Sequence, residues 1–439
     1  MERKVRIISI SGQPVSGKST TINKITELLK LEGIKEEDIH VVSVGNNFRA
    51  YFNKIMDLAS NLKNKTLEEL KDTSVDAELK QLCSNEVNRK KLKQALVNLI
   101  MSDFDFDKFD IEKANNSDKL KEIRDIIDTI VDTKVTELGK EAIKNNRENE
   151  VWIMDSRLAF SNIPESFAVR LTIRDDVAGK RLFAGSAQRG KEDNAYATVE
   201  EAMEKTIKRG QGEEKRYKER YGVELSNEDN YNLIIDTSFS NVDDIAKTIL
   251  KCEERERQEK YYGKRWTSPK TLLPIQKIAE TFDRENVELI EKLEDNISKS
   301  GYDVSEEVEI FVHDGRKYLN DGNHRVVVLA EHGETMIPYE ERKYSISASE
   351  AYSGEMTLEN LIMFTNIFRK HSPDFSYEDI YPGITEIAVK NELKDRYTCQ
   401  YLRMLKENDE EKLNEYFIQL EKQKKYVSGH GEKETDLER

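Results

Sequence analysis

The sequence predicts an α/β protein with a parallel sheet covered by helices on both faces, then a smaller α+β region and a helical C-terminal region. Over about the first 250 residues, short apolar segments alternate with amphipathic ones, which is typical of parallel strands joined by helices. A glycine-rich turn directly follows the first apolar segment. From about residue 270 the pattern changes to a helix, two short strands and another helix.

Apolar segments bounded by turn signals mark the strands of the first region, and longer periodic segments mark its helices. The first strand, "KVRIISIS", leads into an amphipathic helix that ends at Gly33. Between the second and third strands, residues 47–148 are mostly helical and highly charged, and they form a long insert. The later strands are expected at 39–45, 150–157, 167–175 and 231–238.

The rest of the chain is expected to fold separately. A helix over 284–300 ends at Gly301, and Asp314-Gly315 is a hairpin signal between two strands. Another helix follows within "HRVVVLAEHG". The predicted organisation is a first domain (1–251), a charged linker (252–269), an α+β domain (270–345) and a helical region with a disordered tail (346–439).

Composition limits the classes of function. The 70 Lys and Arg against 85 Asp and Glu give a net charge of −15, so no general field draws the chain to nucleic acid, although local basic grooves remain open. Three widely separated cysteines indicate neither a disulfide framework nor a cysteine zinc site. With no signal peptide and no apolar run of membrane-spanning length, we expect a cytoplasmic protein.

The glycine-rich turn fits the phosphate-binding loop (P-loop) pattern G-x-x-x-x-G-K-[ST] from Gly12 to Ser19. It also lies between a strand and a helix, as the pattern requires. Glycines let backbone N–H groups turn toward phosphate oxygens, and the helix presents its positive end there. We expect Lys18 to reach the β- and γ-phosphates of ATP and the Ser19 hydroxyl to bind Mg²⁺.

Further charged residues could neutralise a transferred phosphate. Asp155 ends a predicted strand and is placed to orient Mg²⁺, although a helix-capping role is the alternative. Arg209, Glu213 and Arg216 lie at i, i+4 and i+7, on one helix face. On composition alone, a solvated ion-pair face explains this helix better. Upstream lie further basic residues: Arg170, Arg174, Lys180, Arg181 and Arg189.

Over about residues 5–250 the sequence resembles the cytidylate kinase-like branch of nucleoside monophosphate kinases. The P-loop, "SVGNNFR", "MDSRL", "VRLTIRDD", "R-x-x-x-E-x-x-R-Y" and "YNLIIDTS" occur in that family's order. Two features depart from it: "MDSRL" replaces a usual Glu-Gly-Arg-Leu, and the insert exceeds what a compact CMP kinase needs. The larger insert could accept a bulkier acceptor than CMP.

The resemblance implies a role for each matching residue. The residues expected to bind the nucleotide are Gly12, Ser16, Gly17, Lys18, Ser19 and Thr20. Those expected to bind the acceptor are Arg49 and Arg157, and those expected to bind Mg²⁺ are Ser19 and Asp155. The residues expected to act in phosphoryl transfer are Lys18, Asp155, Arg174, Arg181, Arg189, Arg209 and Arg216.

Residues 270–345 contain a second charged motif, "DGNHR", between a predicted strand and a predicted helix. Turn and capping residues alone could explain it. The stretch is similar to the ParB N-terminal/sulfiredoxin-like superfamily, which implies a nucleotide or phosphate pocket. That pocket would be lined by Asp321, Asn323, His324 and Arg325. Asn323 stands where sulfiredoxins have their reactive Cys, which argues against reductase chemistry.

The predicted function is therefore ATP-dependent phosphoryl transfer to CMP, dCMP or a related small acceptor, with the ParB-like domain adding nucleotide or partner binding. A hydroxyl acceptor would need a carboxylate base, for which Asp155 is the candidate. Two alternatives stay open. One is an ATP switch coupled to a DNA-binding module, and the other is a kinase of modified pyrimidines in DNA or of free serine.

Overall fold

The protein, in a computed structural model, is α/β with a mixed, mostly parallel set of strands. The structure describes residues 4–66, 73–83, 85–102, 104, 120–188, 196–274, 284–313, 316–333 and 335–342. The predicted helical region and tail (346–439) lie outside them. The chain divides into an N-terminal unit (Met1–Ser238 and Val242–Glu259) and a C-terminal unit (Phe239–Asn241 and Lys260–Arg439).

Five parallel strands form the sheet of the N-terminal unit, in the order β2-β3-β1-β4-β5. All five lie at the predicted places, because apolar side chains fill them: β1 (Arg6–Gly12), β2 (Ile39–Ser43), β3 (Val151–Asp155), β4 (Phe167–Thr172) and β5 (Leu233–Asp236). In the register, Ile10 of β1 and Ser43 of β2 lie beside Asp155. The carboxyl ends of the strands therefore meet at one edge.

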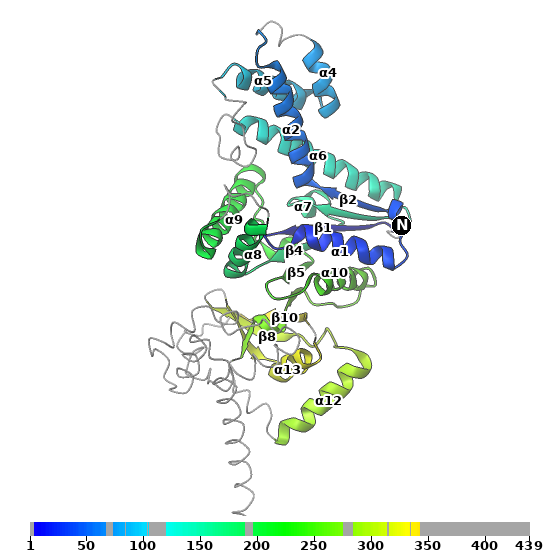
Figure 1. The fold of residues 1–439 in the computed structure, drawn as a ribbon. Coiled ribbons are helices and arrows are strands. Elements are labelled where there is room, and N and C mark those ends of the chain that lie inside the picture. The colour runs from blue at the N-terminus through cyan, green and yellow to red at the C-terminus, as the bar shows by residue number, and fades with distance from the viewer. Residues whose placement is uncertain are drawn as a thin grey trace, which may run out of the picture. The chain divides into compact units, whose positions relative to one another are not determined.

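Helices cover both faces of this sheet, as the sequence predicts (Figure 1). On one side α1 (Lys18–Leu31) packs against α10 (Val242–Arg257). On the other side lie α7 (Ala159–Asn162) and the end of α6 (Lys121–Asn145), with Val135 and Ala142 of α6 buried against the strands. Two further helices, α8 (Asp175–Gln188) and α9 (Val199–Tyr221), pack against each other.

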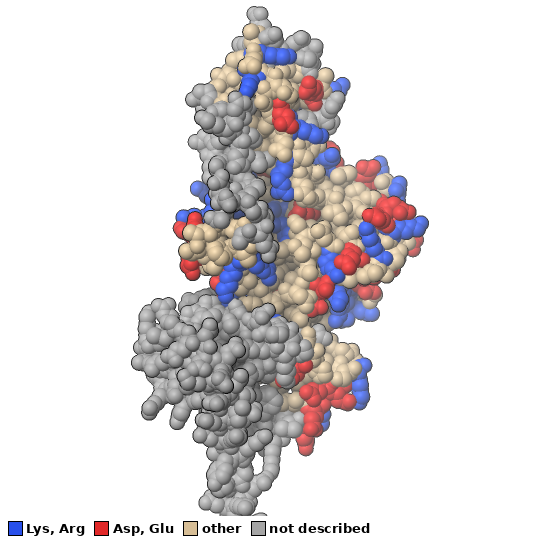
Figure 2. Space-filling model, in the orientation of Figure 1, with Lys and Arg blue, Asp and Glu red and all other residues tan. Residues whose placement is uncertain are grey.

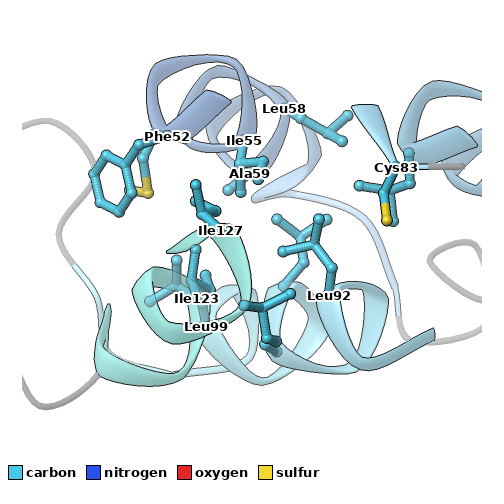
Figure 3. Packing of buried hydrophobic residues seen from close by; sticks show 14 of the residues in the cluster. Phe52, Ile55, Leu58, Ala59, Cys83, Leu92, Leu99, Ile123 and Ile127 are labelled. Carbon is cyan, nitrogen blue, oxygen red and sulfur yellow. The ribbon is translucent and has the colours of Figure 1, made fainter. Parts of the chain in front are cut away.

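The long insert forms a helical subdomain with a hydrophobic core of its own (Figure 3). Its described helices are α2 (Val44–Leu62), α4 (Thr73–Leu82), α5 (Glu86–Ile100) and the first part of α6. Phe52 and Ile55 of α2, Leu92 of α5 and Ile123 and Ile127 of α6 are all at most 1% exposed. Apolar residues at helical spacing on each helix produce this core.

The residues 252–257, predicted as part of a linker, form the end of α10. Glu253 is buried there because Arg6 pairs with one carboxylate oxygen (2.8 Å) and Arg257 with the other (2.9 Å). This burial could not be predicted from the sequence, because the charged residues around Glu253 show no hydrophobic residues at helical spacing. Charged side chains are buried in this way only when they are paired.

The C-terminal unit contains strands in the order β6-β10-β8-β9-β7. The predicted hairpin corresponds to β8 (Val308–His313) and β9 (Arg316–Asp321), which are antiparallel, and α12 (Arg284–Ser300) and α13 (Asn323–Glu331) match the predicted helices. The remaining strands are β6 (Arg265–Thr267), β7 (Leu272–Pro274) and β10 (Ile337–Glu341). Among the described residues, no helix is long and apolar enough to cross a membrane.

Candidate functional site

The loop between β1 and α1 is a tight turn held against β4. The backbone N–H of Gln13 donates to the carbonyl of Leu171 (3.0 Å), and the N–H of Ile173 donates to the Gln13 side chain (2.7 Å). A Cβ at Gly12 would meet the Leu171 oxygen at 2.7 Å, and Gly17 has a φ of 85°. Both glycines of the motif are therefore demanded by the geometry of the turn.

One buried polar group of this loop, the side chain of Ser16, makes no hydrogen bond. Ser16 is buried, and its Oγ has no hydrogen-bond partner, while its carbonyl accepts from the Thr237 hydroxyl (3.1 Å). Buried hydroxyl groups almost always have a partner, so this one marks a place where a polar ligand would fit. Ser19 and Thr20, in the first turn of α1, are exposed.

Lys18, the first residue of α1, lies among charges from other elements. Burial and, to a smaller extent, the charge of Arg157 lower the pKa of Lys18 to about 8, while the carboxylates of Asp155 and Glu213 oppose this effect. Glu213 of α9 pairs with both Arg157 and Arg209, the latter at 3.2 Å. The loop thus lies beside a network of alternating charges, drawn from the end of β3 and from α9.

Asp155 and Arg157 reach this network from the end of β3. The Asp155 carboxylate accepts a hydrogen bond from the Ser43 hydroxyl (2.8 Å), and the Arg157 guanidinium donates to the Gly12 carbonyl. Asp155 is half-buried and ends its strand rather than capping α7, which begins at Ala159. Among the described residues, no group of three or more His, Cys, Asp or Glu gathers as a metal site.

Two of the predicted transfer arginines are engaged by the protein itself. Arg174 forms a two-pronged ion pair with Asp176 (2.6 and 2.8 Å). Arg181 donates to the carbonyls of Thr237 (2.6 Å) and Ser238 (3.1 Å), and burial lowers its pKa. Arg181 therefore holds the segment after β5, whose Thr237 in turn binds the β1–α1 loop.

Two more of the predicted arginines, Arg216 and Arg49, are described. Arg216 of α9 is half exposed and lies 3.5 Å from Asp128 of α6. Arg49 is exposed on α2, where it donates to the Asn46 side chain (2.5 Å). Arg189 lies outside the described residues.

The sequence analysis missed an acidic row on α6. Asp125, Asp128 and Asp132 lie on one helix face and meet Arg216 and Arg220 of α9. Burial raises the pKa of Asp128 to about 6, although both arginines act in the opposite direction. The spacing i, i+3, i+7 was the available signal, but many solvated helices carry such charges.

In the C-terminal unit, the second predicted motif follows β9. Asp321 pairs with Arg325 (2.7 Å), and Arg325 also donates to the carbonyls of Glu306 (2.8 Å) and Glu307 (3.0 Å). Gly322 is the N-cap of α13 with a φ of 103°. These contacts fasten the start of α13 to the segment before β8.

Two further residues of that motif lie in the first turn of α13. Asn323 is buried, at 8% exposure. His324 is half-buried; its Nε2 is enclosed without a hydrogen-bond partner, and burial lowers the pKa of the ring. The motif residues are thus close in space, as their sequence proximity requires.

Comparison with known proteins gives partial matches. No family model matches the sequence. The chain is 32% identical over 107 residues (24% of its length) to an S-adenosylmethionine-dependent nucleotide dehydratase of Lacinutrix mariniflava, of which it covers 20%. It is 29% identical over 133 residues (30% of its length) to a cytidylate kinase of Methanosphaera stadtmanae, of which it covers 68%.

This chain therefore spans a fifth of the first relative and about two thirds of the second. The second match supports a distant similarity of part of the chain to cytidylate kinase, and with it a kinase-like use of nucleotides at that coarse level. The resemblance of residues 270–345 to the ParB N-terminal domain stays a prediction.

Proposed function

We propose that the chain is an ATP-dependent phosphotransferase of nucleoside monophosphate kinase type. The observation that carries the proposal is the surroundings of Lys18, where Arg157 and the carboxylates of Asp155 and Glu213 converge at the carboxyl edge of the sheet. Phosphoryl transfer depends mainly on positioning and on neutralising the charge of the transferred group. A lysine, arginines and a carboxylate at the end of a phosphate-binding turn meet that need.

Each element of the turn has a role in this proposal. The backbone N–H groups between Gly12 and Gly17, with the start of α1, would hold the phosphates of ATP, and the Ser16 hydroxyl would gain a partner there. Lys18 would lie on the β- and γ-phosphates. The Ser19 hydroxyl and the Asp155 carboxylate are oxygen donors of the kind that Mg²⁺ prefers, and Mg²⁺ would neutralise phosphate charge.

The acceptor proposed is CMP, dCMP or a related small molecule. The partial similarity to a cytidylate kinase supports a nucleotide, and the length of the insert (47–148) favours a larger acceptor than CMP. Arg157 is within the charge network, whereas Arg49 is exposed on α2 and would have to approach the acceptor phosphate. A hydroxyl acceptor would instead use Asp155 as the base.

Transfer from γ-labelled ATP in Mg²⁺ tests the proposal. The acceptors are CMP, dCMP, UMP, TMP, free serine and single-stranded DNA with hydroxymethylated pyrimidines. Label in CDP or dCDP supports the nucleotide kinase. Label in serine or DNA supports a different kinase with the same site. ATP loss that occurs only with added DNA, and without any labelled product, would contradict the proposal and favour an ATP switch.

A further inference from the structure

Helix α9 contacts two different parts of the N-terminal unit. Its middle part, which contains Arg209 and Glu213, lies at the proposed phosphate site, where Glu213 pairs with Arg157 and Arg209. Gly210 comes close to the loop there, since a Cβ at this position would lie 3.8 Å from the Pro14 ring. Side chains of its last turns, from Arg216 to Tyr221, instead reach α6.

Arg220 makes four polar contacts with α6. Its guanidinium lies 3.0 Å from the Asp125 carboxylate and 3.4 Å from that of Asp128. It also donates to the Thr129 hydroxyl (2.6 Å) and to the backbone carbonyl of Asp125. Because residues 125, 128 and 129 share one face of α6, a single planar side chain reaches all of them.

A second pair of residues extends this contact. The hydroxyl of Tyr221, the residue after Arg220, donates to the carboxylate of Asp132, which lies one turn after Asp128 on α6 (2.9 Å). We call Arg220, Tyr221, Asp125, Thr129 and Asp132 the α6–α9 clasp. Burial raises the pKa of Asp132, while Tyr221 and Arg220 lower it. A buried carboxylate without its partner is strongly unfavourable, so the clasp resists opening.

The clasp holds α9 against a helix that is fixed at both ends. The first part of α6 belongs to the core of the insert through Ile127, and its last part belongs to the core under the sheet through Val135 and Ala142. Figure 2 shows both basic and acidic side chains on the visible described face. The ion pairs of α9 with α6 are specific pairs of these two kinds of side chain.

We infer that Arg220 is a positioning residue that sets the place of α9, and thereby of Arg209 and Arg216, at the proposed phosphate site. This inference rests on the proposed function. Arg216 is held in the same way, since it lies one turn before Arg220 and pairs with Asp128 of the same row of acidic residues on α6. A movement of the insert would be transmitted through α6 and the clasp to these arginines.

The test combines single and double variants in the full chain, with transfer from labelled ATP to the best acceptor. We expect R220Q to lower kcat by at least about tenfold, with little change in the KM for ATP. The reason is that Arg209 and Arg216 are no longer held where they stabilise the charge of the transition state. The matched control is K218Q on the same turn, whose ion pair with Glu224 is exposed. K218Q should leave kcat unchanged.

A double-mutant cycle separates positioning from a general structural role. If Arg220 acts through Arg216, R220Q has little further effect in an R216Q background. Equal losses in both backgrounds would overturn the inference, as would an unchanged kcat in R220Q. If thermal unfolding shows that R220Q does not fold, T129V takes the place of R220Q in the cycle, because it removes one of the hydrogen-bond acceptors of Arg220. An unmodified chain that transfers no phosphate overturns the proposed function itself, whereas normal transfer with an unchanged R220Q overturns only the clasp.

Discussion

The N-terminal and C-terminal units each contain a strand that leads through a glycine of positive φ into a helix, yet their surroundings differ. The N-cap glycines are Gly17 (φ 85°) before α1 and Gly322 (φ 103°) before α13. Around Lys18 the neighbouring charges come from β3 and α9, far away in the sequence. At the second junction, Asp321 and Arg325 pair with each other. The turn alone therefore does not make a phosphate site.

The difference lies in how the local charges are satisfied. Arg325 is bound by two carboxylates, those of Asp321 and Glu306, and by two backbone carbonyls, so little capacity remains for a ligand. Burial lowers the pKa of His324, which favours its neutral form at pH 7. Each junction encloses a polar atom without a hydrogen-bond partner, the Ser16 hydroxyl at the first and His324 Nε2 at the second, but the first also has the ammonium group of Lys18, with a pKa of about 8. The following variants are designed to break or sharpen this comparison.

The largest effect is expected from K18A. Loss of the lysine that neutralises phosphate charge should lower transfer by about 10²–10³-fold, since that is the typical cost of removing one such group. The fold should be unchanged, as measured by thermal unfolding. K24A on the same helix, where Lys24 pairs with Glu27 and Asp243, is the matched control and should retain activity. Full transfer by K18A would show that this junction is not the site.

Arginine variants compare the two junctions directly. R157A should lower transfer by at least about tenfold, because it removes a positive charge beside Lys18 that would neutralise phosphate charge. R325A should leave transfer unchanged and lower only the stability of the C-terminal unit. The measurements are kcat, KM and the urea unfolding midpoint of each variant. Equal losses of kcat in both variants would remove the distinction between the junctions.

The pH dependence of the site follows from Lys18. Above a pH of about 8 this lysine loses its proton, so kcat/KM for ATP should fall by about tenfold per pH unit. In K18R the guanidinium stays charged, and this decrease in kcat/KM should move to higher pH.

The free energy of unfolding should change in the opposite direction and increase with pH. Between pH 8 and 10.5 the folded chain binds fewer protons than the unfolded chain, so this group's contribution to stability rises with pH. A decrease in kcat/KM that persists in K18R would assign it to another group.

A backbone test compares two glycines. G12A should destabilise the chain by about 1–3 kcal/mol, because its Cβ would overlap the Leu171 carbonyl at 2.7 Å. In G212A the new Cβ meets nothing within 4 Å inside α9, and the variant should be more stable by about 0.5–1 kcal/mol. Urea unfolding measures both changes. Equal midpoints for the two variants would contradict the close packing of the loop.

The smallest effect is expected from H324A. His324 belongs to the C-terminal unit, whereas the proposed transfer site belongs to the N-terminal unit, so phosphate transfer should not change. Labelled-ATP transfer by the full chain measures this, with K18A as the inactive reference. A clear loss of transfer in H324A would mean that the second junction takes part in catalysis. That result would contradict the conclusion that only the junction at Lys18 forms the transfer site.

Strands and the phosphate-binding turn could be predicted from the sequence because their signals are local. The five strands of the first sheet coincide with apolar runs, and Gly12 and Gly17 have the geometry that their motif requires. Long-range pairing could not be predicted. The sequence placed Arg216 on the face of Arg209 and Glu213, but its partner Asp128 is 88 positions away and appears only in the fold.

Burial of charged residues was equally hidden. Glu253 lies in a charged run that predicts a linker, and it is buried because Arg6, from the first strand, pairs with it. Arg174 and Arg181 fit the predicted transfer role by position, yet the structure pairs them with Asp176 and with backbone carbonyls. In each case the deciding partner is set by the tertiary structure, and hydropathy carries no information about it.

The most direct test of the central claim is the binding of ATP to the unmodified chain, to K18A and to H324A by isothermal titration calorimetry with Mg²⁺ present. The account predicts one ATP per chain for the unmodified protein and for H324A, and strongly weakened binding for K18A. Binding that persists in K18A and disappears in H324A would place the nucleotide site at the second junction and contradict the account.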